Sequence, residues 1–164
     1  MNVRALFGLS GLMSFVASGV FAKLYAWPRL RVMDRDDALV PLVVPHMFLR
    51  FIGLSFLVPG VVSPSIPAAF AVPAAFGDLV AGLMAIAAVV ALSRRRSWAI
   101  SLVWIFNVWG AADLLFAGVQ GPINHLDPGA LGASFFIPTA IVPPLLVTHA
   151  LVFRVLIQPT PPVL

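Results

Sequence analysis

The 164-residue sequence contains no cysteine and no glutamate, and charged residues make up only 10% of it. A chain without cysteine forms no disulfides, thiolate metal sites or CxxC redox pairs, and it has no cysteine nucleophile. A water-soluble domain usually carries about 25% charged residues, so the shortage of charge excludes an ordinary soluble fold. Because 61% of the residues are apolar and the mean hydropathy is +1.04, the composition places the chain in a lipid bilayer.

Apolar stretches long enough to cross a bilayer follow one another along the chain. A helix needs about 20 such residues, at 1.5 Å per residue, to cross about 30 Å of hydrocarbon. Five stretches meet this length: residues 5–22, 38–62, 67–92, 98–119 and 130–153. They use most of the chain, so we predict an all-α fold in which residues 1–164 form a single transmembrane domain, a helical bundle of five spans.

Basic residues fall on one side of this five-span arrangement. That side receives eight of them: Lys23, Arg29, Arg31, Arg35, Arg94, Arg95, Arg96 and Arg154. Since basic residues accumulate on the cytoplasmic side, we predict an outside N-terminus and a cytoplasmic C-terminus, in a multi-pass protein of a bacterial-type cytoplasmic (inner) membrane. The formal net charge of +4 follows from this asymmetry. It does not indicate nucleic-acid binding, because no basic domain lies outside the spans.

The first span has two interpretations. Small residues near its end and Arg4 before it are compatible with a cleaved signal peptide. Alternatively, the span is retained, because Ser10, Ser14 and Ser18 form a stripe of small residues at helical spacing. Such a stripe suits close helix packing in membranes. We therefore expect retention.

Six polar or charged side chains fall inside the predicted spans, where each is costly to bury. They are His46 and Arg50 in the second span, Asp78 in the third, Asn107 and Asp113 in the fourth, and His149 in the fifth. We expect them to meet in the bundle interior. Arginine stays charged there and needs a counter-ion. Asp78, at the same depth as Arg50, is the first choice, and Asp113 lies nearer the outer face.

Helix breakers surround these polar residues. They are Pro41 and Pro45 before His46, Pro138, Pro143 and Pro144 before His149, and Gly110 between Asn107 and Asp113. Proline removes a backbone donor, and broken helices at membrane depth are tolerated where they line a cavity. The pattern favours a hydrated path or pocket beside the polar residues.

Two functional hypotheses follow from this pattern. In the first, the polar cluster translocates a proton, an ion or a small solute, and the five-helix chain assembles with another copy or with a partner membrane subunit. In the second, the protein is a non-catalytic membrane subunit or scaffold in which the Arg, Asp and Asn side chains only specify helix packing. We expect no enzymatic activity, because no GxSxG, HExxH or comparable catalytic spacing occurs.

A third hypothesis is a b-type haem held between His46 and His149, which lie at similar depth on different helices. Arg50, one turn from His46, would place a cation against the porphyrin. In the loop of residues 120–129, His125 and Asp127 supply only two ligands, too few for a metal site. We therefore expect no cofactor and no metal.

Overall fold

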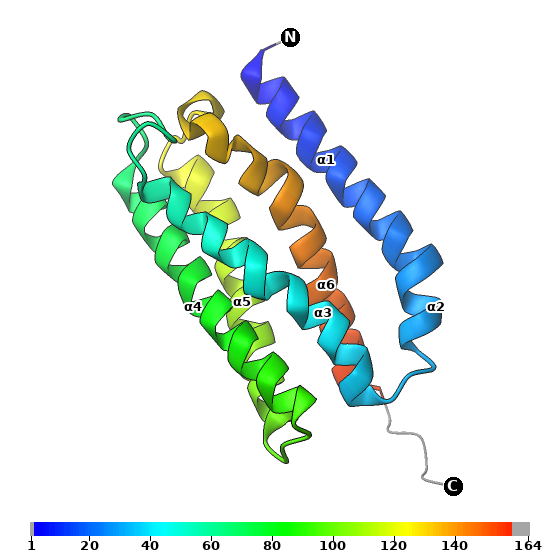
Figure 1. Ribbon diagram of the computed structural model, residues 1–164. Coiled ribbons are helices and arrows are strands. Elements are labelled where there is room, and N and C mark those ends of the chain that lie inside the picture. The colour runs from blue at the N-terminus through cyan, green and yellow to red at the C-terminus, as the bar shows by residue number, and fades with distance from the viewer. Residues whose placement is uncertain (1, 159–164) are drawn as a thin grey trace, which may run out of the picture.

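The computed structural model describes residues 2–158, which form a bundle of helices with no strand in that range (Figure 1). Helix α1 (Val3–Phe21) continues through a π-helical turn, Ala22–Ala26, into the short α2 (Trp27–Leu30). Helix α3 (Arg35–Leu49) runs into a 3-10 segment, Arg50–Leu57, and is followed by α4 (Ala68–Ser93) and α5 (Ala99–Ile123). A 3-10 segment, Pro128–Phe135, and a π-helical turn, Ile137–Ile141, precede α6 (Val142–Leu156).

Five continuous helical segments are long and apolar enough to cross a membrane: Val3–Leu30, Arg35–Leu57, Ala68–Ser93, Ala99–Ile123 and Ile137–Leu156. Three predicted boundaries differ most from these. The first helix extends to Leu30, where we expected residue 22 to be its end. The second ends at Leu57 because Val58 is extended and Gly60 adopts a positive φ of 84°. The fifth begins at Ile137, since the preceding 3-10 segment is interrupted at Gly132, which has φ 54° and ψ −129°.

Four of the long helices enclose the interior. Helix α3 packs on α4 and α6, and α5 packs on the same two, so that these helices form a closed ring, while α1 lies outside along α6 (Figure 1). Helix α1 contributes no buried residue. The prediction that its serine stripe packs closely is wrong at Ser10, which is exposed, and Ser14 and Ser18 are only half-buried.

Helix α4 is positioned by a stripe of small side chains. Its buried residues include Ala71, Ala74, Ala75, Ala81, Gly82, Ala85, Ala88 and Ala91. Small residues at helical spacing let neighbouring backbones approach closely, which is how helices associate where water supplies no hydrophobic driving force. Asp78 interrupts this stripe near the middle of the helix, so its carboxylate faces the centre of the bundle.

The clusters of basic residues lie at one end of the bundle, which we call the basic end (Figure 1). Two contacts join its parts: Arg95 pairs with Asp37 at 2.9 Å, and the guanidinium of Arg154 lies 3.6 Å from the ring centroid of Trp27. At the opposite, distal end, the Ser63 amide donates to the Ala130 carbonyl at 2.9 Å, joining the loops of residues 58–67 and 124–136.

The prolines inside the bundle disturb the helices less than expected. Helix α3 passes through Pro41 and Pro45 and tightens into 3-10 geometry only at Arg50. Pro143 and Pro144 lie in the first turn of α6, where the helix passes from the π-helical turn Ile137–Ile141 into α-helical geometry without a break. Along α3 and its continuation, the irregular backbone therefore begins at Arg50 and extends toward the distal end.

Candidate functional site

Arg50, at the start of the 3-10 segment after α3, is the centre of the polar cluster. Its side chain is fully buried, and a guanidinium carries five N–H donors. All five find acceptors: Nε at His46 Nδ1 (3.5 Å), Nη1 at Asp78 Oδ1 (2.6 Å) and Asp113 Oδ2 (2.9 Å), and Nη2 at the Gly110 carbonyl (2.6 Å) and His149 Nε2 (2.9 Å). One arginine thus joins α3, α4, α5 and α6.

The contact with Arg50 fixes the tautomer of His149. An arginine only donates, so the Nε2 atom of His149 is the acceptor and carries no proton. The proton of the neutral ring is then on Nδ1, which donates to Asn107 Oδ1 at 2.7 Å. Asn107 returns a hydrogen bond from Nδ2 to the His149 carbonyl at 3.2 Å. Asn107 therefore orients the imidazole that faces the arginine.

The same reasoning applies to His46. Its Nδ1 accepts from Arg50, which leaves the proton on Nε2, 2.9 Å from the hydroxyl of Thr148. The Thr148 hydroxyl donates in turn to the Leu145 carbonyl at 2.8 Å. No side-chain nitrogen or oxygen within residues 2–158 is both buried and without a hydrogen-bond partner, so every fully buried polar atom of the cluster is paired.

The two carboxylates each have an oxygen that Arg50 does not use. Asp78 Oδ2 and Asp113 Oδ1 have no hydrogen-bond partner, and neither is a buried unpaired atom, so both reach a surface. Asp78 and Asp113 both line a cavity of about 700 Å³, the distal cavity. Their free oxygens lie against the backbone at Gly53 and Gly77, respectively. Their side chains remain only 9% and 11% exposed. The remaining wall is largely apolar and comes from α1, the segment after Arg50, α4, α5 and the chain from Leu126 to Leu146.

Glycines provide the space that the cluster occupies. A Cβ atom on Gly53 would overlap the carboxylate of Asp78, and one on Gly77 would overlap that of Asp113. A Cβ on Gly110 would lie 2.6 Å from the ring of His149 and 2.9 Å from Arg50 Nη2. We expected Gly110 to break its helix, but α5 runs through it without interruption. Because Gly110 has no side chain, His149 and Arg50 can approach its backbone closely.

We call the part of the bundle between the cluster and the basic end the basic half. Apolar side chains fill its interior. Leu39, Val43, Val103, Phe106 and Val152 are all completely buried there. The ring of Phe106 also lies 5.1 Å from that of His46 and 5.3 Å from that of His149. The cluster therefore separates a tightly packed half from the distal half, which contains the cavity.

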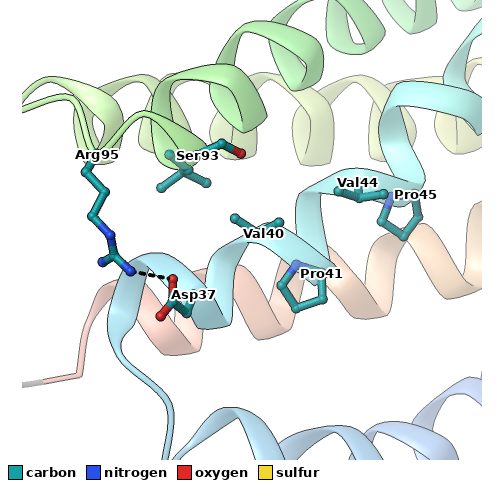
Figure 2. Close-up of a pocket in the computed structure, with 8 residues that line it drawn as sticks. Asp37, Val40, Pro41, Val44, Pro45, Ser93 and Arg95 are labelled. Atoms are coloured by element: carbon teal, nitrogen blue, oxygen red, sulfur yellow. Dashed lines mark hydrogen bonds and ion pairs between the residues drawn. The ribbon is translucent and has the colours of Figure 1, made fainter.

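A second hollow lies on the surface of the basic half and does not involve the polar cluster. This groove of about 520 Å³ runs between α3 and the end of α4, as Figure 2 shows. Val40, Pro41, Val44 and Pro45 line it along α3, and the exposed pair of Arg95 and Asp37 stands at one end. Neither a histidine nor a buried carboxylate lines it.

The geometry does not fit a haem. The imidazole rings of His46 and His149 are 4.3 Å apart between centroids, which leaves no room for a porphyrin between them. Their nitrogens already bond to Arg50, Thr148 and Asn107. Within residues 2–158, no group of three or more His, Cys, Asp or Glu could hold a metal ion. His125 and Asp127 are exposed in the distal loop.

The six residues singled out from the sequence all join this cluster. Asn107 and Asp113 face different partners, as their spacing predicts, and Asp113 shares Arg50 with Asp78. The sequence did not indicate Thr148 or the Gly110 carbonyl. Thr148 is adjacent to His149, but a hydroxyl beside a histidine is too common to mark a site, and a backbone acceptor has no signature in the sequence.

Comparison with known proteins identifies a family. Residues 6–157 match the family model described as Domain of unknown function (DUF8737). No curated protein and no solved structure matches the chain. With nearly the whole sequence covered by the family model, the chain belongs to the DUF8737 family.

Proposed function

We propose that this protein is an integral membrane protein that translocates a proton or another small cation, with Asp78 and Asp113 as the binding groups. The observation that carries the proposal is the position of these carboxylates. Each gives one oxygen to Arg50 and keeps a second oxygen that is neither hydrogen-bonded nor fully buried, and both residues line the distal cavity. A buried ionisable group that a cavity reaches is the usual mark of an ion or proton pathway in a membrane protein.

The formal charges of the cluster support uptake of a cation. Both histidines are neutral because each accepts a hydrogen bond from Arg50. With Asp78 and Asp113 ionised, two negative charges face one guanidinium, and the cluster is one positive charge short of neutrality. Uncompensated charge is costly at membrane depth. A proton or a monovalent cation arriving through the cavity restores neutrality.

The difference between the two halves supports a carrier. The cavity reaches the carboxylates from the distal side, whereas buried apolar side chains fill the basic half. A binding site reached from one side at a time is the basis of alternating access. Arg50 cannot lose its proton, so protons do not pass through the guanidinium itself. Translocation therefore requires a second conformation in which the carboxylates face the basic end.

The arrangement in the membrane belongs to the same proposal. The basic residues gathered at one end support a cytoplasmic basic end, with the N-terminus and the distal cavity outside. Assembly with another copy or with a partner membrane subunit remains our expectation for a five-helix carrier.

Proton flux into liposomes tests the function directly. Purified protein is reconstituted with an enclosed pH-sensitive dye, and a potassium gradient with valinomycin sets the membrane potential. We expect the wild type to acidify the lumen faster than protein-free liposomes do. Asp113→Asn removes a charge without changing the shape and should abolish the difference. Asp127→Asn, in the exposed distal loop, is the matched control and should behave as the wild type. Flux equal to that of protein-free liposomes, from folded wild-type protein, would refute proton translocation.

The scaffold function remains a second candidate, because every donor of Arg50 is satisfied. Such a network fixes the order and rotation of four helices without any transport. Replacing the whole charged set together, as Arg50→Gln, Asp78→Asn and Asp113→Asn, distinguishes the two. A scaffold should keep its fold and its cellular phenotype in this variant, whereas a carrier should keep its fold and lose flux.

A further inference from the structure

We propose that the distal cavity binds an apolar organic cation of single charge, an ammonium or phosphonium with an aromatic or aliphatic body, against Asp78 and Asp113. The inference rests on the proposed function and gives it a substrate class. The cavity of about 700 Å³ is large compared with a proton or a bare ion. Pockets of this size in proteins hold small organic molecules.

The charge at the inner end of the cavity selects the sign of the ligand. Asp78 and Asp113 are the two acidic residues of a largely apolar wall, each with one oxygen free of hydrogen bonds, and the cluster behind them lacks one positive charge. Arg50 and the two histidines are the other charged or titratable groups of the cluster. Arg4 also lines the cavity, but its side chain is exposed near the distal end. Solvent screens that charge much more strongly than the buried ones.

The side chains of the cavity wall favour a ligand with an apolar body. Phe7, Phe15, Phe56 and Phe70 line the cavity, and aromatic faces attract cations as well as burying apolar surface. Metal cations fit less well: Ca²⁺ and Mg²⁺ take about six or more oxygen ligands, whereas the two carboxylates have one free oxygen each. An organic cation needs only the charge and the apolar contact.

Helix α1 provides a route for such a ligand. It forms part of the cavity wall through Phe7 and Phe15, yet it has no buried residue and packs mainly on α6 and the segment before it. Because α1 buries no side chain, it can separate from the bundle at lower cost than a ring helix. An apolar cation partitioned in the bilayer can then enter laterally, between α1 and α5.

Proton and cation compete for the same oxygens. Neutrality requires one positive charge, so an arriving cation displaces the proton that a carboxyl holds. One proton leaves for each monovalent cation bound, and the total charge of the site is unchanged. Binding should therefore weaken as the pH falls, and this exchange is the coupling that a cation–proton antiporter requires.

Isothermal titration calorimetry on the detergent-solubilised protein tests the inference with tetraphenylphosphonium and tetraphenylborate, which have the same shape and opposite charge. We expect the phosphonium to bind and the borate to bind at least about tenfold more weakly. Titrations in buffers of different ionisation enthalpy count the protons released. Asp113→Asn should weaken phosphonium binding by about tenfold or more and abolish proton release.

A second pair of variants tests the location. Gly118 lines the cavity and has open space around its Cβ position, so Gly118→Phe should occupy the cavity and abolish binding. Gly8 on α1 also has open space around its Cβ position, but it does not line the cavity. The Gly8→Phe variant is therefore the control and should bind the phosphonium as the wild type does. Equal affinity for the two probes, or unchanged binding in both Asp113→Asn and Gly118→Phe, would overturn the inference.

The outcomes separate this inference from the proposed function. Wild-type proton flux without phosphonium binding would refute the substrate class and leave translocation standing. Phosphonium binding with proton release, but without any flux in liposomes, would refute translocation and leave the cavity as a binding site.

Discussion

The two halves of the bundle differ in how regular their helices are. In the basic half, α3, α4, α5 and α6 are α-helical, and buried alanine, valine and leucine fill the space between them. In the distal half, the chain after α3 is a 3-10 segment, and 3-10 and π-helical segments precede α6. Irregular backbone at membrane depth is tolerated where it lines a cavity. The cavity and the irregular segments do occur together here.

Arg50 lies at the boundary between the halves. It is the first residue of the 3-10 segment, so the change in helix geometry and the polar cluster coincide. The tighter turn brings Gly53 over Asp78. Buried apolar side chains fill the basic half, whereas in the distal half a smaller buried core lies beside the cavity. Substitutions should therefore affect stability mainly in the first half and at the boundary.

The largest loss of stability is expected at the boundary, from Arg50→Met. The variant leaves Asp78 and Asp113 facing each other without a cation, and removing one partner of a buried ion pair costs about 3–5 kcal/mol. The free energy of unfolding can be measured by SDS titration in mixed micelles. Adding Asp78→Asn and Asp113→Asn to Arg50→Met should recover part of the loss. A variant as stable as the wild type would show that the cluster contributes nothing to the bundle.

A matched pair of leucine truncations compares the halves directly. Leu39 is completely buried in the basic half, and Leu39→Ala should reduce the free energy of unfolding by about 2–5 kcal/mol. Leu146 is half-buried and lines the distal cavity, so Leu146→Ala enlarges an existing space and should cost less than about 1 kcal/mol. The same titration measures both. Equal losses would mean that the distal half is packed as tightly as the basic half.

The sequence predicts the spans and the polar cluster because both depend on the cost of placing groups in hydrocarbon. Long apolar runs must be helical there, and charged residues such as Arg50 and Asp78 must turn inward. The haem hypothesis treated His46 and His149 as ligands of one iron at a similar depth. The structure does not fit that interpretation, because both imidazole rings accept hydrogen bonds from the guanidinium of Arg50.

Hydropathy does not predict the cavity, nor does it predict that α1 lies outside the ring of helices and buries no side chain. Helix α1 is as apolar as the ring helices, yet it buries no residue, so hydrophobicity alone did not distinguish it from them. The distal cavity is lined in part by the 3-10 and π-helical segments. The close approaches at Gly53, Gly77 and Gly110 depend on helix rotation, which follows from packing against neighbours.

The smallest effect is expected at the groove of Figure 2, outside both the boundary and the core. Arg95 and Asp37 form an ion pair of 2.9 Å, but their side chains are 62% and 50% exposed. Exposed pairs of this kind contribute about 0.2–1 kcal/mol, and salt screens them. Arg95→Gln removes the charge, and its free energy of unfolding should lie within about 1 kcal/mol of the wild-type value and approach it as salt is added. A loss that exceeds the cost of Leu146→Ala and persists in salt would show that the surface of the basic half stabilises the bundle as well as its core.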